Sequence, residues 1–319
     1  MRTLPILAAI LLTVALPGVL RSQSAAGADD GFSLLRAGKP EQAREVFEAV
    51  LAKDPASTAA QSGEVQASEQ LALQYRAAAN RDEALRTLLR AKDHVTGSPR
   101  LYYDLGILED EMRLFHDADE SLAHAAESMG NDPNLLYAIA RVKMDLGLLG
   151  PAEEEMQAYL KLRPEDASAH YGLGRIYQIA LQFDKARSEF ARSIELKPVQ
   201  TEAYYELGDI ALKQGQFQDA LVQFGKTLER DPRHGGALEG AGETNYKLKR
   251  YDDARQYLER AVDAAPGYPP CHYYLGLTLA RLGQKEASQR ELETASKMSE
   301  QQNAAAPLRL QQSTAPPKR

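Results

Sequence analysis

A spacing of 34 residues repeats along most of this chain of 319 residues. Shifting the segment from Thr201 to His234 back by 34 residues places it on the segment from Ala167 to Gln200, with apolar and small residues in register. The matched pairs are Leu207 with Leu173, Gly208 with Gly174, Phe217 with Phe183, Ala220 with Ala186, Phe224 with Phe190, and Pro232 with Pro198. A fixed period of this length predicts an array of small repeats, each packing on its neighbours, in place of two compact domains.

Eight repeats fit into the chain, and six of them follow one another without a gap. The gapless repeats cover residues 99–132, 133–166, 167–200, 201–234, 235–268 and 269–302. Two weaker repeats cover 24–57 and 65–98, with a seven-residue insertion, 58–64, between them. Seven residues are close to two helical turns, so this insertion can lengthen a helix without rotating its apolar face. The predicted repeat array is therefore 25–302.

Each repeat has the pattern of two antiparallel helices. In the repeat 201–234, apolar residues recur at spacings of three and four, as on one face of a helix; they are Tyr204, Leu207, Gly208 and Ala211. Gly215 lies in the following turn, where a helix end favours left-handed dihedral angles. Asp231-Pro232 ends the second helix, because proline cannot continue one.

On these residues the chain resembles the tetratricopeptide repeat family, whose module is a helix–turn–helix of 34 residues. The family pattern is kept at Leu207-Gly208, Ala220, Phe224 and Pro232, and the resemblance covers about Ser24 to Gln302. It implies an all-α fold, a right-handed superhelical solenoid of about eight helix–turn–helix repeats. The repeats leave no segment large enough for a separate catalytic domain. We therefore expect a non-enzymatic interaction scaffold, with no catalytic residues and no cofactor.

In proteins of this family the first helices line a concave groove, and the residue after the packing aromatic points into it. Tyrosine occupies that place in five repeats, and Glu239 occupies it in a sixth; the tyrosines are Tyr103, Tyr137, Tyr171, Tyr205 and Tyr273. A tyrosine ring offers a flat apolar face and a hydroxyl at low entropic cost, which suits ligand recognition. The alternative is that the rings only pack against the neighbouring repeat.

The next groove-facing place, four residues further along each first helix, carries charge. Arg141 and Arg175 are followed by Asp209 and Glu243, so an extended ligand would be oriented by complementary charge. The alternative is ion pairing between neighbouring repeats, Arg175 with Asp209 most obviously. No repeat holds the Lys–Asn pair with which some relatives clamp the C-terminal carboxylate of cytosolic chaperones, so that subclass is excluded.

Composition argues against metal, disulfide and nucleic-acid chemistry. Cys271 is the only cysteine, which rules out a disulfide within the chain and a zinc site built on several cysteines. The six histidines show no i, i+4 pair with a third ligand nearby, so no metal site is predicted. A net charge of −7 opposes generic binding to nucleic acid.

The N-terminus has the order of regions found in a secretory signal peptide. One arginine precedes an uncharged stretch from Leu4 to Leu20, and small residues follow, so cleavage is expected after Ser24 or after Ala26. The predicted signal peptide is 1–24. An uncleaved N-terminal anchor is the alternative, although Pro17-Gly18 breaks a stretch already shorter than the ~20 residues of a membrane span. The expected location is periplasmic or secreted, with no transmembrane domain after cleavage.

The C-terminal residues 303–319 contain three prolines and are predicted to be disordered. An array whose last repeat lacks a cap exposes apolar surface there, which predicts weak self-association through the C-terminal repeat. Taken together, the sequence predicts a scaffold that binds an extended peptide or a partner subunit in the concave groove, in the bacterial cell envelope. The alternative is a glycan-binding module of a polysaccharide export or envelope assembly system, since tyrosine rings also stack on sugars.

Overall fold

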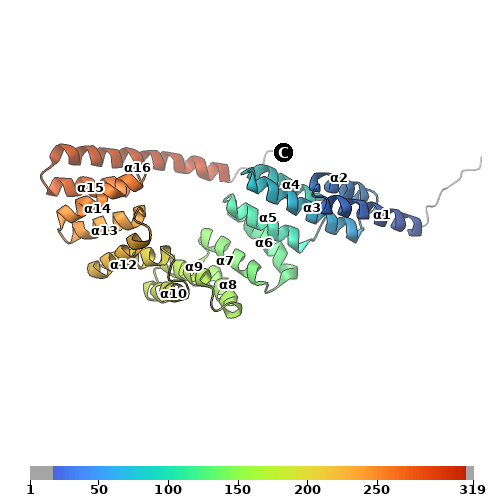
Figure 1. Ribbon diagram of the computed structural model, residues 1–319, viewed down its shortest axis with the longest axis horizontal. Helices are drawn as coiled ribbons and strands as arrows, with labels where there is room; N and C mark the ends of the chain where they lie inside the picture. The colour runs from blue at the N-terminus through green and yellow to red at the C-terminus, as the bar shows by residue number, and fades with distance from the viewer. Residues whose placement is uncertain (1–16, 314–319) are drawn as a thin grey trace, which may run out of the picture. The chain divides into compact units, whose positions relative to one another are not determined.

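The computed structural model describes residues 17–313, with side chains for 27–304, and these residues form sixteen helices and no strand (Figure 1). The helices are α1 (Pro17–Arg36), α2 (Pro40–Leu51), α3 (Thr58–Ala77), α4 (Arg81–His94), α5 (Pro99–Glu111), α6 (Phe115–Met129), α7 (Pro133–Asp145), α8 (Leu149–Leu162), α9 (Ala167–Ile179), α10 (Phe183–Leu196), α11 (Glu202–Lys213), α12 (Phe217–Arg230), α13 (Gly235–Lys247), α14 (Tyr251–Ala264), α15 (Pro269–Arg281) and α16 (Lys285–Ser313). The predicted all-helical repeat fold is confirmed.

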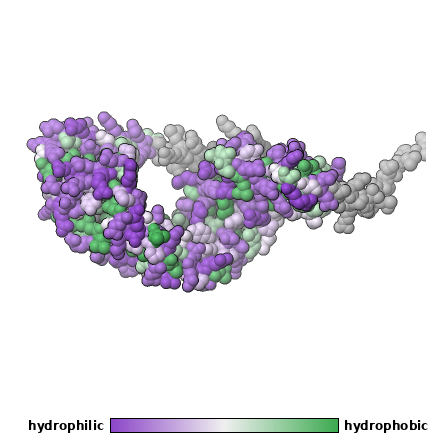
Figure 2. Space-filling view, in the orientation of Figure 1, coloured by the Kyte–Doolittle hydropathy of each residue, from purple (hydrophilic) through white to green (hydrophobic). Residues whose placement is uncertain are grey.

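Consecutive helices pair into eight hairpins, and the chain divides into two compact bodies. The N-terminal body holds the described residues up to Gly130, which form α1 to α6. The C-terminal body begins at Asn131 and holds α7 to α16. Most of the visible face in Figure 2 is hydrophilic, with smaller apolar patches among the charged residues.

Each hairpin closes where a small residue of the first helix lies under a large side chain of the second. A Cβ built on Gly208 would lie 2.7 Å from a ring carbon of Phe224, and one on Gly174 would lie 2.7 Å from Phe190. The same relation, sixteen residues apart along the chain, recurs at Gly106 with Leu122, Gly242 with Leu258 and Gly276 with Leu292. Phe224 is 1% exposed. These positions are glycine because the helix backbones approach too closely for a larger residue.

One residue in each hairpin turn has a positive φ angle. Glycine fills this place in four turns, with φ between 70° and 79°, at Gly38, Gly147, Gly215 and Gly283. The other four turns hold residues with a Cβ at φ between 57° and 63°, namely Ala79, Arg113, Leu181 and Lys249. The left-handed turn expected at Gly215 is therefore confirmed, and half of the turns adopt it at a steric cost.

The seven-residue insertion 58–64 forms the first two turns of α3. Ser57 caps the helix by accepting a hydrogen bond from the backbone N–H of Ala60. Buried residues continue at helical spacing from Ala60 through the insertion to Ala72, so one buried face, mostly apolar, runs along the helix. The insertion lengthens the helix without rotating this face, as the sequence predicts.

The two ends of the described chain are both helical. Residues 1–16 of the predicted signal peptide lie outside the described residues, and the backbone of 17–24 opens α1, so export stays a prediction. Disorder was expected from Asn303, but α16 continues to Ser313.

None of the helices formed by residues 17–313 combines the length and the apolar composition needed to cross a membrane.

Candidate functional site

Four of the five predicted groove tyrosines lie on first helices of the C-terminal body. Three of them pack against the second helix of their own hairpin: the ring centroids are 5.3 Å apart for Tyr137 and Tyr159, 5.6 Å for Tyr171 and Phe190, and 6.1 Å for Tyr205 and Phe224. Tyr273 on α15 is 48% exposed. Tyr103 belongs to the N-terminal body, where the guanidinium of Arg100 lies 5.6 Å from its ring centroid.

Tyr205 also contacts the following repeat. Its ring centroid lies 4.9 Å from that of His234, and a Cβ on Gly236 would come within 2.9 Å of the ring. Burial is the main cause that raises the pKa of Tyr205 well above its usual value, so the hydroxyl stays protonated. Tyr205 therefore packs between neighbouring repeats, and this packing leaves less of its ring available to a ligand.

The predicted charged row forms contacts between α9 and α11. Arg175 Nη1 donates to Glu206 Oε1 at 2.8 Å, and the Tyr171 hydroxyl donates to the same oxygen at 3.3 Å. Gln178 Nε2 donates both to Glu206 Oε2 at 2.8 Å and to Asp209 Oδ2 at 3.0 Å. The expected partner of Arg175 was Asp209; the observed partner is Glu206, nearly one helical turn earlier on α11.

A cluster of carboxyl groups follows on α11 and α13, and we call it the acidic cluster: Asp209, Glu239 and Glu243. Asp209 pairs with Lys213 at 2.6 Å and Glu243 with Lys247 at 3.2 Å, each within its own helix. Glu239 is 9% exposed. Burial, followed by the carboxylates of Glu243 and Asp209, raises the pKa of Glu239 to about 7. The sequence analysis named Asp209 and Glu243 but treated Glu239 only as an interruption of the tyrosine row.

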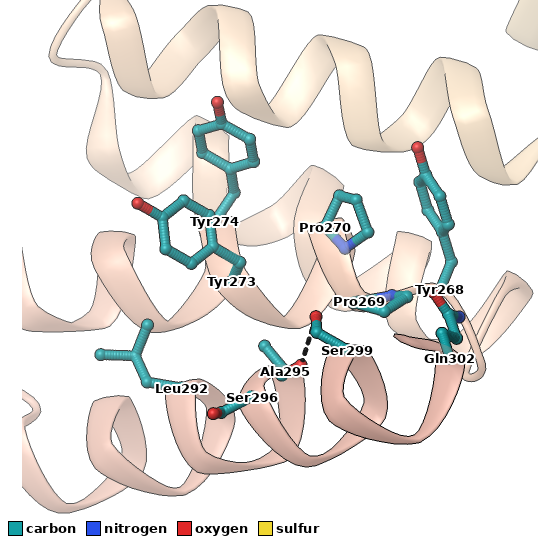
Figure 3. Close-up of a pocket in the computed structure, with 10 residues that line it drawn as sticks. All are labelled: Tyr268, Pro269, Pro270, Tyr273, Tyr274, Leu292, Ala295, Ser296, Ser299 and Gln302. Atoms are coloured by element: carbon teal, nitrogen blue, oxygen red, sulfur yellow. Dashed lines mark hydrogen bonds between the residues drawn. The ribbon is translucent and has the colours of Figure 1, made fainter. Parts of the chain in front are cut away.

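A pocket of about 670 Å³ lies between α16 and the N-terminal part of α15 (Figure 3). Tyrosine, proline and small side chains line it: Tyr268, Pro269, Pro270, Tyr273, Tyr274, Leu292, Ala295, Ser296, Ser299 and Gln302. Of the predicted groove residues, Tyr273 is the one that reaches this pocket. Tyr268 is 44% exposed, so two ring faces here are open to a ligand. Aromatic faces with hydroxyl groups suit an apolar or proline-containing peptide segment.

Two histidines form matching contacts three repeats apart. His170 Nδ1 lies 2.6 Å from Glu189 Oε2, and its Nε2 lies 3.1 Å from the carbonyl oxygen of Pro164. His272 has the same distances to Glu291 and Pro266. Each imidazole thus ties the first helix to the second helix and to the preceding loop. The two histidines therefore have a structural role within their hairpins.

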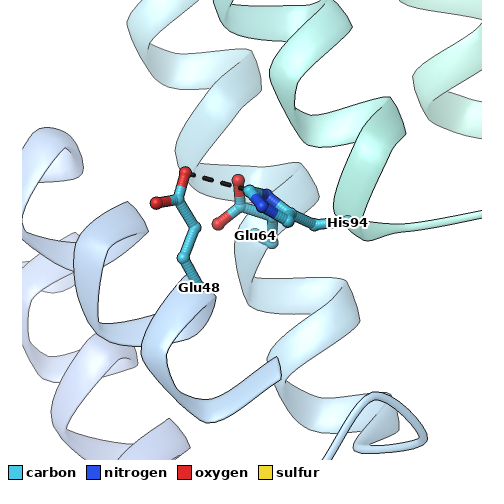
Figure 4. A group of neighbouring side chains, drawn as sticks. All are labelled: Glu48, Glu64 and His94. Atoms are coloured by element: carbon cyan, nitrogen blue, oxygen red, sulfur yellow. Dashed lines mark ion pairs between the residues drawn. The ribbon is translucent and has the colours of Figure 1, made fainter. Parts of the chain in front are cut away.

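A second candidate site lies in the N-terminal body, where Glu48 of α2, Glu64 of α3 and His94 of α4 meet (Figure 4). One potential ligand atom from each residue lies within 4.8 Å of the other two. Glu64 is 0% exposed. Burial, then the carboxylate of Glu48, raises the pKa of Glu64 to about 8. The sequence predicted no metal site, because these residues are far apart along the chain and show no ligand spacing.

The single thiol is buried. Cys271 on α15 is 0% exposed, and burial, with a smaller contribution from Glu239, raises its pKa to about 12. A thiol held protonated is a poor nucleophile, so this residue acts as a small apolar side chain.

Three family models described as tetratricopeptide repeat match the chain. One matches residues 137–200, 179–226 and 205–269, a second matches 245–311, and a third matches 31–57. Together these matches span more than half of the 319 residues. No curated protein matches the sequence.

Solved structures share the fold at low sequence identity. PilF of Pseudomonas aeruginosa aligns with a TM-score of 0.56 and 18% identity, over 66% of this chain and 96% of its own. PilW, a type IV pilus biogenesis factor, aligns with a TM-score of 0.55 and 17% identity, over 60% and 90%. A tetratricopeptide repeat protein from Parabacteroides merdae aligns with a TM-score of 0.54 and 15% identity, over 86% and 99%. These similarities concern the fold.

Proposed function

The chain belongs to the tetratricopeptide repeat family, and on that basis we propose that it is a non-enzymatic scaffold that holds an extended segment of a partner protein. Repeat proteins of this family serve as protein–protein interaction scaffolds. The binding surface is the row of first helices in the C-terminal body, from α9 to the pocket beside α15. We further propose which kind of segment this surface binds.

The observation that carries this proposal is the acidic cluster. Glu239 is buried against two further carboxylates, and no Lys, Arg or His of the described side chains pairs with it. Surface pairs such as Asp209 with Lys213 contribute about 0–1 kcal/mol and exchange readily for a better cation. Three carboxyl groups beside Tyr205 and Tyr268 therefore suit a Lys or Arg side chain, which gains both charge pairing and an aromatic face.

The proposed ligand is thus an extended peptide with a basic residue at the acidic cluster and apolar or proline residues at the pocket. Arg175 already pairs with Glu206, so it offers a ligand less positive charge than the sequence predicts. The tyrosines add contact area along the row. Charge at the acidic cluster would fix the register of the segment, and the pocket would supply most of the apolar burial.

Peptide display tests this proposal, and a glycan array tests the alternative of glycan binding. Selection on residues 25–319 should enrich peptides with a basic residue at a fixed distance from apolar or proline residues. Tyr273→Ala should weaken the selected peptide at least about fivefold, because loss of an aromatic anchor costs about 1 kcal/mol or more. Binding to glycans and not to peptides, or affinity unchanged within threefold in both Tyr273→Ala and Glu243→Gln, would reject the peptide groove.

We also propose that residues 1–24 direct export to the bacterial envelope. The supporting observation is the order of a charged, an apolar and a small-residue region in the sequence. Cell fractionation followed by N-terminal sequencing tests it. A mature N-terminus at Ala25 or Gly27 in the periplasmic fraction is expected. An intact Met1 in a membrane fraction would favour the anchor.

A further inference from the structure

The N-terminal body contains three potential metal ligands from three successive helices. Glu48 comes from α2, Glu64 from α3 and His94 from α4, and Figure 4 shows their ends converging. His94 Nδ1 lies 3.8 Å from Glu48 Oε1. With metal–nitrogen and metal–oxygen bonds of about 2.0–2.2 Å, two ligand atoms of a tetrahedral zinc site lie about 3.3–3.6 Å apart. The three atoms, now within 4.8 Å of one another, would have to approach by up to about 1.5 Å, which side-chain rotation can supply.

One residue of this cluster has a buried oxygen without a partner. Glu64 Oε1 is within 3.5 Å of the Ser68 hydroxyl, but Glu64 Oε2 has no hydrogen-bond partner among the described residues. Glu48 Oε1 likewise has no hydrogen-bond partner there. A fully buried carboxylate oxygen without a donor or cation is costly, because burial removes its hydration. This unsatisfied oxygen is the independent sign that the cluster lacks a ligand.

The charges around the cluster leave room for a cation. Arg90 Nη2 donates to Glu48 Oε2 at 2.5 Å, and Arg44 pairs with Glu41 and lies 3.7 Å from Glu48 Oε1. Two arginines thus face three carboxyl groups, Glu41, Glu48 and Glu64, and neither arginine pairs with Glu64. Arg44 is the group that competes with an ion for Glu48 Oε1. The His94 side chain is 37% exposed, so an ion can enter from its side.

We propose that Glu48, Glu64 and His94 bind a divalent transition-metal ion, with Zn²⁺ the best match. Two carboxylates and one imidazole form a mixed oxygen and nitrogen ligand set, which suits Zn²⁺ with water in the remaining position. The ion would connect the second helix of the first repeat to both helices of the second. It acts as a structural tie between these repeats, and stabilises them in proportion to its occupancy.

The test is calorimetric titration of ZnCl₂ into the chain starting at Ala25, without an affinity tag. One zinc ion per chain is expected. His94→Ala, at the exposed side of the cluster, should weaken binding at least tenfold, and Glu64→Gln should do the same, because each removes one of three protein ligands. The matched control is His124→Ala, which removes an exposed histidine of α6 that lies 3.6 Å from Glu127. This control should bind zinc as tightly as the native chain.

Hydrogen exchange gives a second readout that locates the ion. Zinc should slow amide exchange in α2, α3 and α4 of the native chain and leave these helices unchanged in His94→Ala. The proposal is wrong if zinc does not bind below about 1 mM. It is also wrong if His94→Ala binds zinc within threefold of the native chain, or if the protected amides lie outside these helices. Should Glu64→Gln fail to fold, His94→Ala decides alone.

Discussion

Arg175 on α9 donates to the carboxylate of Glu206 on α11 at 2.8 Å, and this contact joins two consecutive repeats. The Glu206 side chain is 8% exposed, whereas that of Arg175 is 38% exposed. The carboxylate is therefore the buried member and depends on its donors, Arg175, Gln178 and Tyr171.

Removing the guanidinium should destabilise the C-terminal body. Arg175→Ala leaves the buried Glu206 carboxylate with fewer donors, and we expect a loss of about 1–2 kcal/mol, less than for a fully buried pair because Arg175 is partly solvated. Urea unfolding measures the change. Adding Glu206→Gln to Arg175→Ala should recover part of the loss. Glu206→Gln alone completes the cycle, and single-variant losses that add up to the loss of the double variant would show that the pair is not coupled.

A methyl group at a close helix crossing should also destabilise the fold. Gly208→Ala places a Cβ 2.7 Å from the buried Phe224 ring, and the cost of overpacking exceeds the gain in helix propensity, for a net loss of about 1 kcal/mol. The control is Gly225→Ala on α12, where no atom would lie within 4 Å of the new Cβ. That variant should gain about 0.5–1 kcal/mol. Thermal unfolding should therefore shift in opposite directions for the two variants.

Glycine should be preferred in the turns that now hold a larger residue. Leu181 has a φ angle of 57° and is 72% exposed, so Leu181→Gly relieves backbone strain and loses little packing. We expect a gain of about 0.5–1 kcal/mol after the entropic cost of glycine in the unfolded chain. Val199→Gly, at a site 76% exposed without positive φ, is the control and should lose stability. A lower melting temperature for Leu181→Gly would contradict this reading.

The raised pKa of Glu239 predicts a pH-dependent stability. Its pKa is about 7 in the folded chain against 4.5 for the ordinary value, so the folded state binds the proton more tightly. The resulting stability is complete below about pH 4.5 and is lost as pH rises to about 7. Glu239→Gln should remove this loss and gain about 1–3 kcal/mol over the native chain at pH 8. Urea unfolding at pH 5 and pH 8 measures it. Glu229→Gln, at an exposed position of α12, should show no such difference.

The thiol of Cys271 should resist alkylation in the folded chain. Its pKa of about 12 and its complete burial keep both the thiolate population and the access of reagent low at pH 8. Iodoacetamide labelling followed by mass spectrometry should modify Cys271 only after unfolding in urea. Rapid labelling without denaturant would show that α15 opens locally.

The hairpins could be predicted from sequence because each one places small and apolar residues at the same packing positions, which produces the 34-residue period. Gly208 and Phe224 recur at corresponding places of the repeats and face each other across the hairpin, and the insertion before Val65 keeps the helical phase. The continuation of α16 to Ser313 differs from the disorder that the prolines of 303–319 predict.

The site was predicted less completely, because its chemistry depends on neighbours that the period does not specify. The position of Arg175 followed from the repeat, but the choice between Glu206 and Asp209 as its partner depends on side-chain direction across a helix crossing. Glu48, Glu64 and His94 share no sequence spacing that indicates ligation. Only the stacking of three helices brings them together.

The buried carboxyl of Glu239 gives the proposed binding reaction a calorimetric signature. A cationic side chain beside it would favour ionisation and expel the proton into solvent, so association would be coupled to proton release. The measured heat would then depend on the ionisation enthalpy of the buffer, and affinity for a basic segment would increase between pH 6 and pH 8. Titrations in phosphate and in Tris would give different enthalpies for one and the same complex.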